Sequence, residues 1–202
     1  MTFWLGDAPL ILASQSRARQ MLLASCGLEF EAMPADIDER ALQENSRLPS
    51  PRDIALLLAR EKARTVSVEH ADRYVIGADQ TLALGDRLFS KPADPVQAAA
   101  QLALLAGHTH ELHSAVAIAR NGNILFDDVS IARMTMRPLR GADIATYLEQ
   151  VGERITTSVG AYQLEHMGVH LFERIDGDHF TILGLPLLSL LAFLRRERLL
   201  AL

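Results

Sequence analysis

A segment rich in serine and arginine, residues 14–19, separates a predicted strand from a predicted helix. The N-terminus of a helix carries free N–H groups and a partial positive charge, and together these bind anions. Arg17 and Arg19 fall in the first helical turn, where a cation is unfavourable by about 0.3–1 kcal/mol unless an anion offsets it. The pattern therefore indicates a phosphate site. The alternative is that Ser16 only caps the helix and both arginines face water.

Two charged residues fall on the apolar side of the next predicted helix. Ile54, Leu57 and Leu58 mark its buried stripe. Lys62 follows Leu58 by four residues and Glu61 follows Leu57 by four, so both lie on that stripe. A buried lysine must extend to the surface, pair with an acid or face a ligand-filled cleft. The pattern predicts either a ligand-binding pair or charges satisfied within the core.

Acidic residues and a second lysine occupy three further segments. Asp79 follows the apolar strand 74–78 directly, and the carboxyl ends of strands line ligand crevices in α/β sheets. Asp79 is therefore a candidate general base or metal ligand, or else a turn residue. Residues 36–39 offer carboxylates to a hard divalent cation, the alternative being a solvated acidic loop. Lys91 precedes a predicted helix start, and its alternative is a solvated loop cation.

The elements that must position these residues alternate between strands and helices in the first half of the chain. Strands are expected at residues 10–13, 28–33 and 74–78, and helices at residues 17–26, 51–69 and 95–105. The second half contains a predicted hairpin of strands 113–120 and 124–136, a helix at 141–150, a hairpin of strands 171–175 and 180–183, and a closing helix at 186–198. This order predicts an α/β fold with a mixed central sheet flanked by helices, and two lobes around a cleft.

The composition excludes several classes of protein. The chain has 202 residues, 20 basic and 25 acidic, so its net charge is −5, and only 5% of its residues are aromatic. We therefore expect no binding to nucleic acid, which favours basic surfaces and aromatic side chains. The longest apolar run, residues 182–194, is shorter than the ~20 residues of a membrane span, and the single cysteine fits a reducing compartment. We expect one domain over residues 1–202, cytoplasmic and free of the membrane.

Taken in order, these segments resemble the Maf family of nucleoside triphosphate pyrophosphatases. The family pattern L-A-S-x-S-P-R-R corresponds to residues 12–19, and I-[DE]-E corresponds to residues 37–39. The patterns E-K-A, G-[AS]-D-[TQ] and K-P correspond to residues 61–63, 77–80 and 91–92. The remaining matches, L-x-G-x-x-H, G-A-Y and G-L-P, are residues 105–110, 160–162 and 184–186. Each pattern is short, but their order and separations are specific.

The resemblance implies a Maf/ITPase-like fold and hydrolysis of a nucleoside triphosphate between its α and β phosphates. It also implies a divalent cation, Mg²⁺ or Mn²⁺, and a cytoplasmic homodimer. The matched Asp79 takes the role of proton acceptor for the attacking water, and Glu39 and Asp79 take the role of metal ligands. Phosphate binding is carried over to five residues: Ser14, Ser16, Arg19, Lys62 and Lys91.

Three positions bear on the preferred base. Gln80 and Glu165 replace the Thr and Gln of members that act on dTTP and UTP, and they match the branch that acts on 7-methyl-GTP. Ala18 stands where that branch has Trp. A carboxylate accepts two hydrogen bonds from the N1–H and amino group of guanine, whereas uracil and thymine offer one N–H between two carbonyls. We therefore expect a preference for guanine-type or modified purine triphosphates, with Ala18 leaving room for a larger base.

Two other functions are alternatives to this expectation. The first alternative keeps the same reaction class and makes the chain a dTTP/UTP pyrophosphatase. In a different class, it is a non-catalytic regulator of cell division that acts by protein binding, because Maf relatives were first linked to septum formation. An enzyme releases pyrophosphate in the presence of Mg²⁺, and a pure binding protein does not.

Overall fold

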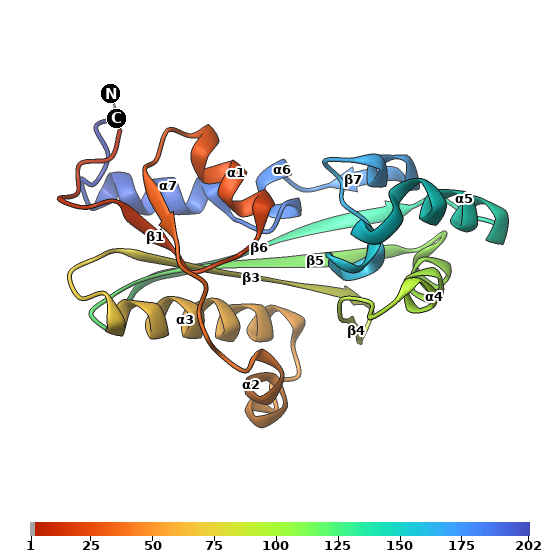
Figure 1. Ribbon diagram of the computed structural model, residues 1–202, viewed down its shortest axis with the longest axis horizontal. Helices are drawn as coiled ribbons and strands as arrows, with labels where there is room; N and C mark the ends of the chain where they lie inside the picture. Colours follow the sequence, from red (N-terminus) through yellow and green to blue (C-terminus); the bar gives the residue numbers. More distant parts are fainter. Residues whose placement is uncertain (1–2) are drawn as a thin grey trace. The chain divides into compact units, whose positions relative to one another are not determined.

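The computed structural model describes residues 3–202, which form two compact units (Figure 1). The first unit contains the described residues through Gln80 together with Ser114–Ser130 and His179–Leu202. The second unit contains Thr81–His113 and Ile131–Asp178. Three strands, β3 (Val75–Leu84), β5 (Thr109–Arg120) and β6 (Asn123–Met136), contribute residues to both units.

The sheet of the first unit contains parallel and antiparallel neighbours. Strand β1 (Leu10–Leu12) pairs in parallel with both β2 (Phe30–Ala32) and β3. The order continues from β3 to β5 and then β6. The turn between β5 and β6 has positive φ at Asn121 and Gly122, as a two-residue hairpin turn requires, and this confirms the hairpin that the sequence predicts.

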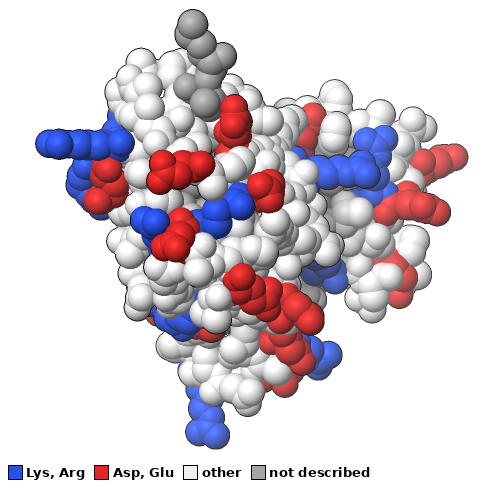
Figure 2. Space-filling view, turned by 60° about the vertical axis from the view of Figure 1, so that its left-hand side comes forward, with Lys and Arg blue, Asp and Glu red and all other residues white. Residues whose placement is uncertain are grey.

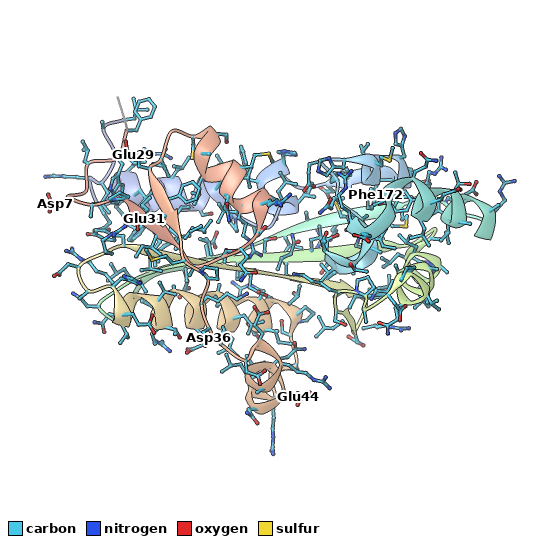
Figure 3. The ribbon with its side chains drawn as sticks, viewed as in Figure 1. Asp7, Glu29, Glu31, Asp36, Glu44 and Phe172 are labelled. Atoms are coloured by element: carbon cyan, nitrogen blue, oxygen red, sulfur yellow. The ribbon has the colours of Figure 1, made fainter. Side chains whose placement is uncertain are left out.

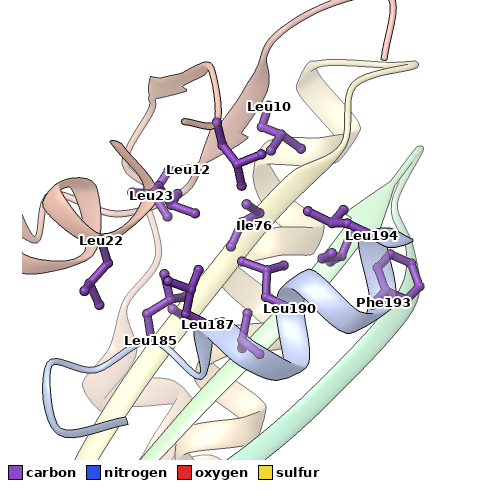
Figure 4. Close-up of a cluster of buried hydrophobic side chains, with 14 of the residues drawn as sticks. Leu10, Leu12, Leu22, Leu23, Ile76, Leu185, Leu187, Leu190, Phe193 and Leu194 are labelled. Carbon is purple, nitrogen blue, oxygen red and sulfur yellow. The ribbon is translucent and has the colours of Figure 1, made fainter. Parts of the chain in front are cut away.

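Helices cover both faces of this sheet. Helix α3 (Pro51–Glu69) lies on one side, and α1 (Arg17–Ser25) and α7 (Leu187–Arg196) lie on the other (Figure 1). On the α1 and α7 side, aliphatic side chains of the helices pack against Leu12 and Ile76 of the strands (Figure 4). On the α3 side, Val66 packs with Ile11 and Val75, and the rest of the contact is centred on small residues: Ala55, Ala59, Ala63, Ala115, Ala117 and Ala119. Small side chains let α3 approach the sheet closely.

The second unit adds strands to the far ends of β3 and β6. Strand β4 (Arg87–Phe89) pairs antiparallel with β3, and β7 (Phe172–Asp176) pairs antiparallel with β6. Helices α4 (Pro95–Leu105) and α5 (Gly141–Val151) pack against each other. Three 3₁₀ segments complete the unit: η1 (Gly152–Thr156), η2 (Val159–Ala161) and η3 (Met167–Leu171).

The mixed sheet flanked by helices confirms the predicted fold class, but several elements differ from prediction. The strand expected to end at residue 78 continues to Leu84, so Asp79 lies within β3 and does not follow its carboxyl end, and β4 and the three 3₁₀ segments were not predicted. Residues 180–183 were predicted as the second strand of a hairpin, and they instead belong to helix α6 (His179–Ile182) and the residue after it. At the turn, Gly177 has φ +150 and passes so close to Ala132 of β6 that a Cβ would lie 2.6 Å from its side chain. The acidic segment before residue 40 leads into an unpredicted helix, α2 (Glu39–Ser46), where the Asp38 carboxylate accepts from Ala41 N–H at 2.9 Å.

The surface carries both signs of charge. On the face drawn in Figure 2, basic and acidic side chains are interspersed, in keeping with the net charge of −5. Among residues 3–202, no helix has both the length and the apolar character that crossing a membrane requires.

Candidate active site

The N-terminus of α1 forms as the sequence predicts. Ser16 caps the helix, its hydroxyl oxygen accepting from the Arg19 N–H at 3.4 Å. The Ser16 N–H donates to the buried Ser14 hydroxyl oxygen at 3.2 Å. Ala13 N–H donates to Ile76 O at 2.8 Å, so the chain leaves β1 beside β3 and turns directly into α1. The two serines therefore lie where a helix terminus offers N–H groups to an anion.

The Arg19 side chain turns inward from α1. Its Nε donates to Gly184 O and its Nη1 donates to Ala78 O, both at 2.8 Å, and Nη1 also lies 3.3 Å from Ser14 Oγ. Burial lowers the pKa of Arg19, and the negative charges of Asp79 and Glu39 oppose that shift. Arg19 thus places a positive charge near the candidate acids and joins α1 to the middle of β3 and to the turn before α7.

Lys62 lies between two carboxylates. Its Nζ is 2.7 Å from Asp79 Oδ1 and 2.8 Å from Glu39 Oε1. Lys62 and Asp79 are 9% and 7% exposed, whereas the Glu39 side chain is 54% exposed. The structure therefore pairs the buried lysine with acids, and these acids are the two predicted metal ligands. Its neighbour Glu61 instead pairs with Arg64 one helical turn away.

Gly77 allows this approach of α3 to β3. A Cβ at Gly77 would lie 2.1 Å from Ala59 O and 2.6 Å from Ala63 N. Because these are backbone atoms, they cannot move aside without displacing the helix. The glycine therefore places Lys62, the residue before Ala63, within reach of Asp79, two residues along the strand.

Of the predicted acidic segment, only Glu39 contacts Lys62. Asp38 caps α2, and Asp36 lies on the extended segment that leads to the helix (Figure 3). Glu44 lies one helical turn after Arg40 on α2 and pairs with it at 2.9 Å on the exposed side (Figure 3). The segment thus combines one site residue with a helix cap, rather than forming an acidic loop.

Gln80 is bound by the protein itself. Its Nε2 lies 2.8 Å from Ser114 Oγ, 3.0 Å from Ile182 O and 3.1 Å from Thr181 O. The Ser114 hydroxyl also donates to Thr181 O at 2.6 Å. The amide group of this predicted specificity residue therefore links β3, β5 and α6. Sequence reasoning missed Ser114, for which the signal was a hydroxyl directly before the apolar run 115–119 of β5. Ala18, also predicted to affect base choice, is half-buried on α1 against the core.

The other two predicted site residues belong to the second unit. Lys91 is exposed between β4 and α4. Glu165 is half-buried and lines a cavity of about 420 Å³ that also has Arg154 and Tyr162 in its wall. The first unit accordingly brings together the predicted residues of α1, α2, α3 and β3. Lys91 and Glu165 belong to the second unit.

A buried His–Tyr pair lies beside this cavity. His110 Nε2 is 2.7 Å from the Tyr162 hydroxyl oxygen, and the His110 side chain has no exposed surface. Burial lowers the pKa of His110 to about 4 and raises the pKa of Tyr162. The imidazole is therefore neutral at pH 7. Sequence reasoning did not name either residue as part of the site, although both fall within matched family patterns.

The carboxylates around Lys62 fit a divalent cation bound together with a phosphorylated substrate. Mg²⁺ is commonly held by one or two carboxylates, with the remaining ligands supplied by water and substrate phosphates. Glu39 and Asp79 are two such carboxylates that meet at one point. In the part of the chain that the structure describes, no group of three or more His, Cys, Asp or Glu side chains is placed to hold a metal ion.

Comparison with known proteins identifies relatives along the whole chain. The chain is 67% identical over 201 residues to the "Nucleoside triphosphate pyrophosphatase" of Bradyrhizobium diazoefficiens, and the match covers 100% of both proteins. It is 66% identical, with the same complete coverage, to the protein of that name from Rhodopseudomonas palustris. It is also 52% identical over 188 residues to the "7-methyl-GTP pyrophosphatase" of Rhizobium etli, covering 92% of this chain and 94% of that protein. A family model described as "Maf-like protein" matches residues 9–197, and the chain therefore belongs to the Maf family.

Proposed function

We propose that this chain is a nucleoside triphosphate pyrophosphatase that cleaves the anhydride between the α and β phosphates. The products are a nucleoside monophosphate and pyrophosphate. The relatives named above support the reaction class. The observation that carries the proposal is the position of Lys62 between Asp79 and Glu39, in the same unit as the serines and arginine at the start of α1.

The groups of the first unit suit a triphosphate. Ser14, Ser16 and Arg19 lie at a helix N-terminus, which binds phosphate oxygens through N–H groups, hydroxyls and positive charge. Lys62 supplies a second buried cation. The family resemblance adds Lys91 as a further phosphate ligand. Cations in these positions stabilise the charge that develops on phosphoryl oxygens in the transition state.

Asp79 is the proposed proton acceptor. Water attacks one phosphorus of the α–β anhydride, the bond from that phosphorus to the bridging oxygen breaks, and a proton of the water passes to the Asp79 carboxylate. In the absence of substrate, Lys62 holds that carboxylate in place, with Nζ 2.7 Å from Oδ1. A divalent cation, Mg²⁺ or Mn²⁺, held by Glu39 and Asp79, would neutralise phosphate charge when bound.

Guanine-type bases are the proposed preference of this enzyme. Glu165 lines a cavity in the second unit, and its two oxygens match the paired donors of guanine. A relative that is 52% identical bears the name 7-methyl-GTP pyrophosphatase, which supports the same preference. Gln80 acts on base choice through its hydrogen bonds to Ser114 and to the carbonyls of α6. The family resemblance adds Ala18, where the 7-methyl-GTP branch has Trp, as a second position that affects base choice.

A panel of triphosphates tests both the pyrophosphatase reaction and the preference for guanine-type bases. GTP, 7-methyl-GTP, dTTP and UTP are each incubated with the protein and Mg²⁺, with and without a chelator, and released pyrophosphate is measured. We expect the guanine compounds to react fastest and the chelator to abolish release. Faster cleavage of dTTP or UTP would refute the base preference, and no pyrophosphate release from any triphosphate would refute the proposed pyrophosphatase activity.

Light scattering and cell fractionation test the homodimer and the cytoplasmic location that the resemblance implies.

A further inference from the structure

Lys62 uses carboxylate oxygens that a metal ion would need. Its ammonium group contacts Asp79 Oδ1 and Glu39 Oε1 at 2.7 and 2.8 Å, which are the distances of charge-assisted hydrogen bonds. The lysine comes from α3, the glutamate from the first residue of α2, and the aspartate from β3. Three separate elements therefore converge on one buried positive charge.

The local charge disfavours a second cation. Lys62 balances one of the two carboxylates, and Arg19 adds another positive charge that interacts with both Asp79 and Glu39. With both cations in place, the four side chains sum to zero. The affinity of an oxygen site for Mg²⁺ or Ca²⁺ depends on the number of negative ligands. A divalent ion entering alone would meet a neutral group and a nearby ammonium, whose repulsion at close range is strong where water is scarce.

We propose that Lys62 acts as an internal counter-cation that holds divalent metal off the site until a triphosphate arrives. This inference rests on the proposed function and concerns the order in which ligands bind. A triphosphate offers Lys62 new oxygen partners, and the metal ion enters with the phosphates as the ammonium leaves the carboxylates. Metal and nucleotide consequently bind with positive cooperativity, and the nucleotide-free protein binds metal weakly.

Mn²⁺ binding to nucleotide-free protein tests the proposal without using activity. Electron paramagnetic resonance measures free Mn²⁺ during a titration of the wild type, Lys62→Met, Lys62→Arg and the double variant Lys62→Met/Asp79→Asn. We expect Lys62→Met to bind Mn²⁺ about tenfold or more tightly than the wild type, because two carboxylates lose their internal cation. Lys62→Arg keeps the charge and should bind weakly, and the double variant should lose the gain.

Arg64→Met is the matched control. Arg64 lies on the same helix, is exposed and pairs with Glu61, so this change removes one positive charge without touching Glu39 or Asp79. Its Mn²⁺ affinity should equal that of the wild type. If Lys62→Met binds no tighter than the wild type, or if Arg64→Met shows the same gain, the proposal is wrong.

A second measurement uses the unaltered protein. Lys62 and Lys91 are the only lysines in the chain, so ¹⁵N-lysine labelling yields two side-chain ammonium signals in NMR spectra. Lys91→Arg assigns them. Millimolar Mg²⁺ alone should leave the Lys62 signal in place, and Mg²⁺ with a triphosphate whose α–β oxygen is replaced by methylene should shift it. A Lys62 shift of the same size with Mg²⁺ alone would overturn the proposal.

The two proposals fail in different ways. Absence of pyrophosphate release from every triphosphate would refute the proposed function. The Mn²⁺ titration of nucleotide-free protein would still report whether Lys62 weakens metal binding. Normal release together with unchanged Mn²⁺ affinity in Lys62→Met would instead refute the role of Lys62 and leave the proposed function intact.

Discussion

Asp79 is the side chain on which the proposed chemistry depends most. It is buried, follows the apolar part of β3 and contacts the Lys62 ammonium. Asp79→Asn keeps the shape of the side chain but removes the proton acceptor, so we expect turnover to fall by about 10²–10⁴ while the fold survives. Lys62 retains Glu39 as a partner in this variant.

The measurement is the rate of pyrophosphate release, with circular dichroism as the check on folding. Asp86→Asn, an exposed carboxylate in the turn between β3 and β4, serves as the control and should retain full turnover. Near-normal turnover in Asp79→Asn would remove this residue from the mechanism.

The Glu165 side chain allows a test of base choice in which a single oxygen is replaced. Glu165→Gln replaces one acceptor oxygen by a donor NH₂, which opposes the amino group of guanine and matches a carbonyl of uracil. We expect the ratio of kcat/KM for GTP over UTP to fall by about tenfold or more. Glu173→Gln, on the exposed part of β7, should leave the ratio unchanged. An unaltered ratio in Glu165→Gln would show that the carboxylate does not read the base.

His110 predicts how stability responds to acid. Burial lowers its pKa to about 4 in the folded protein, while the unfolded chain has the ordinary value of about 6.5. Between these values the unfolded state binds more protons, so stability is lost as the pH falls from about 6.5 towards 4. We expect His110 to lower the free energy of unfolding by about 2 kcal/mol from pH 7 to pH 5.

Urea unfolding at both pH values measures this effect. The His110→Gln variant cannot titrate at this position, so its loss of stability between pH 7 and pH 5 should be smaller than that of the wild type by the same amount. Equal losses in the two proteins would contradict the assignment of a neutral, buried imidazole.

The packing of α3 on β3 depends on a missing side chain. At Gly77 a Cβ would overlap the backbone of α3 at Ala59 and Ala63. We expect Gly77→Ala to lower the free energy of unfolding by about 1–3 kcal/mol, because a rigid helix must move away from the strand. It should also lower turnover, since the same movement displaces Lys62 from the proposed phosphate site.

Urea unfolding and pyrophosphate release measure the two effects. Gly141→Ala is the control, because a Cβ at Gly141 meets open space and its φ is not positive. That variant should have the turnover of the wild type and be at least as stable, because alanine at a compatible φ reduces the entropy of the unfolded chain. If Gly77→Ala were as stable as the wild type, the close contact between helix and strand would be refuted.

The two compact units share three strands, and we therefore propose that residues 1–202 behave as one domain, as the sequence predicts. Because β3, β5 and β6 contribute residues to both units, unfolding of one unit breaks strands that the other unit uses. We predict one cooperative unfolding transition. Trp4, the only tryptophan, is 6% exposed in the first unit and reports on that unit by fluorescence.

Far-UV circular dichroism reports on the helices of both units. The midpoints from fluorescence and circular dichroism should coincide in urea, as a two-state transition requires. A Trp4→Phe, Phe89→Trp variant places the fluorescent probe in the second unit instead. Separate midpoints for the two probes would mean that the units unfold independently.

Most of the elements were predictable from local sequence. Apolar periodicity located α3, Ser50-Pro51 and Asp94-Pro95 marked helix starts, and Asn121-Gly122 marked the turn between β5 and β6. The prediction was wrong at 180–183, because Asp176-Gly177-Asp178 is equally compatible with a hairpin and with a turn into a helix. It also missed α2, whose few apolar residues lack a buried stripe.

The sequence by itself determined the family and most of the elements, and it supplied the candidate charged residues of the proposed site. These follow from short patterns, in which each residue acts on neighbours within a few positions. Only the tertiary structure decided that Lys62 meets both Glu39 and Asp79, and that Gln80 donates to Ser114 and directly to two carbonyls of α6. Such partners lie far apart in the chain, and they meet because the order of strands and the close packing at Gly77 bring their elements together.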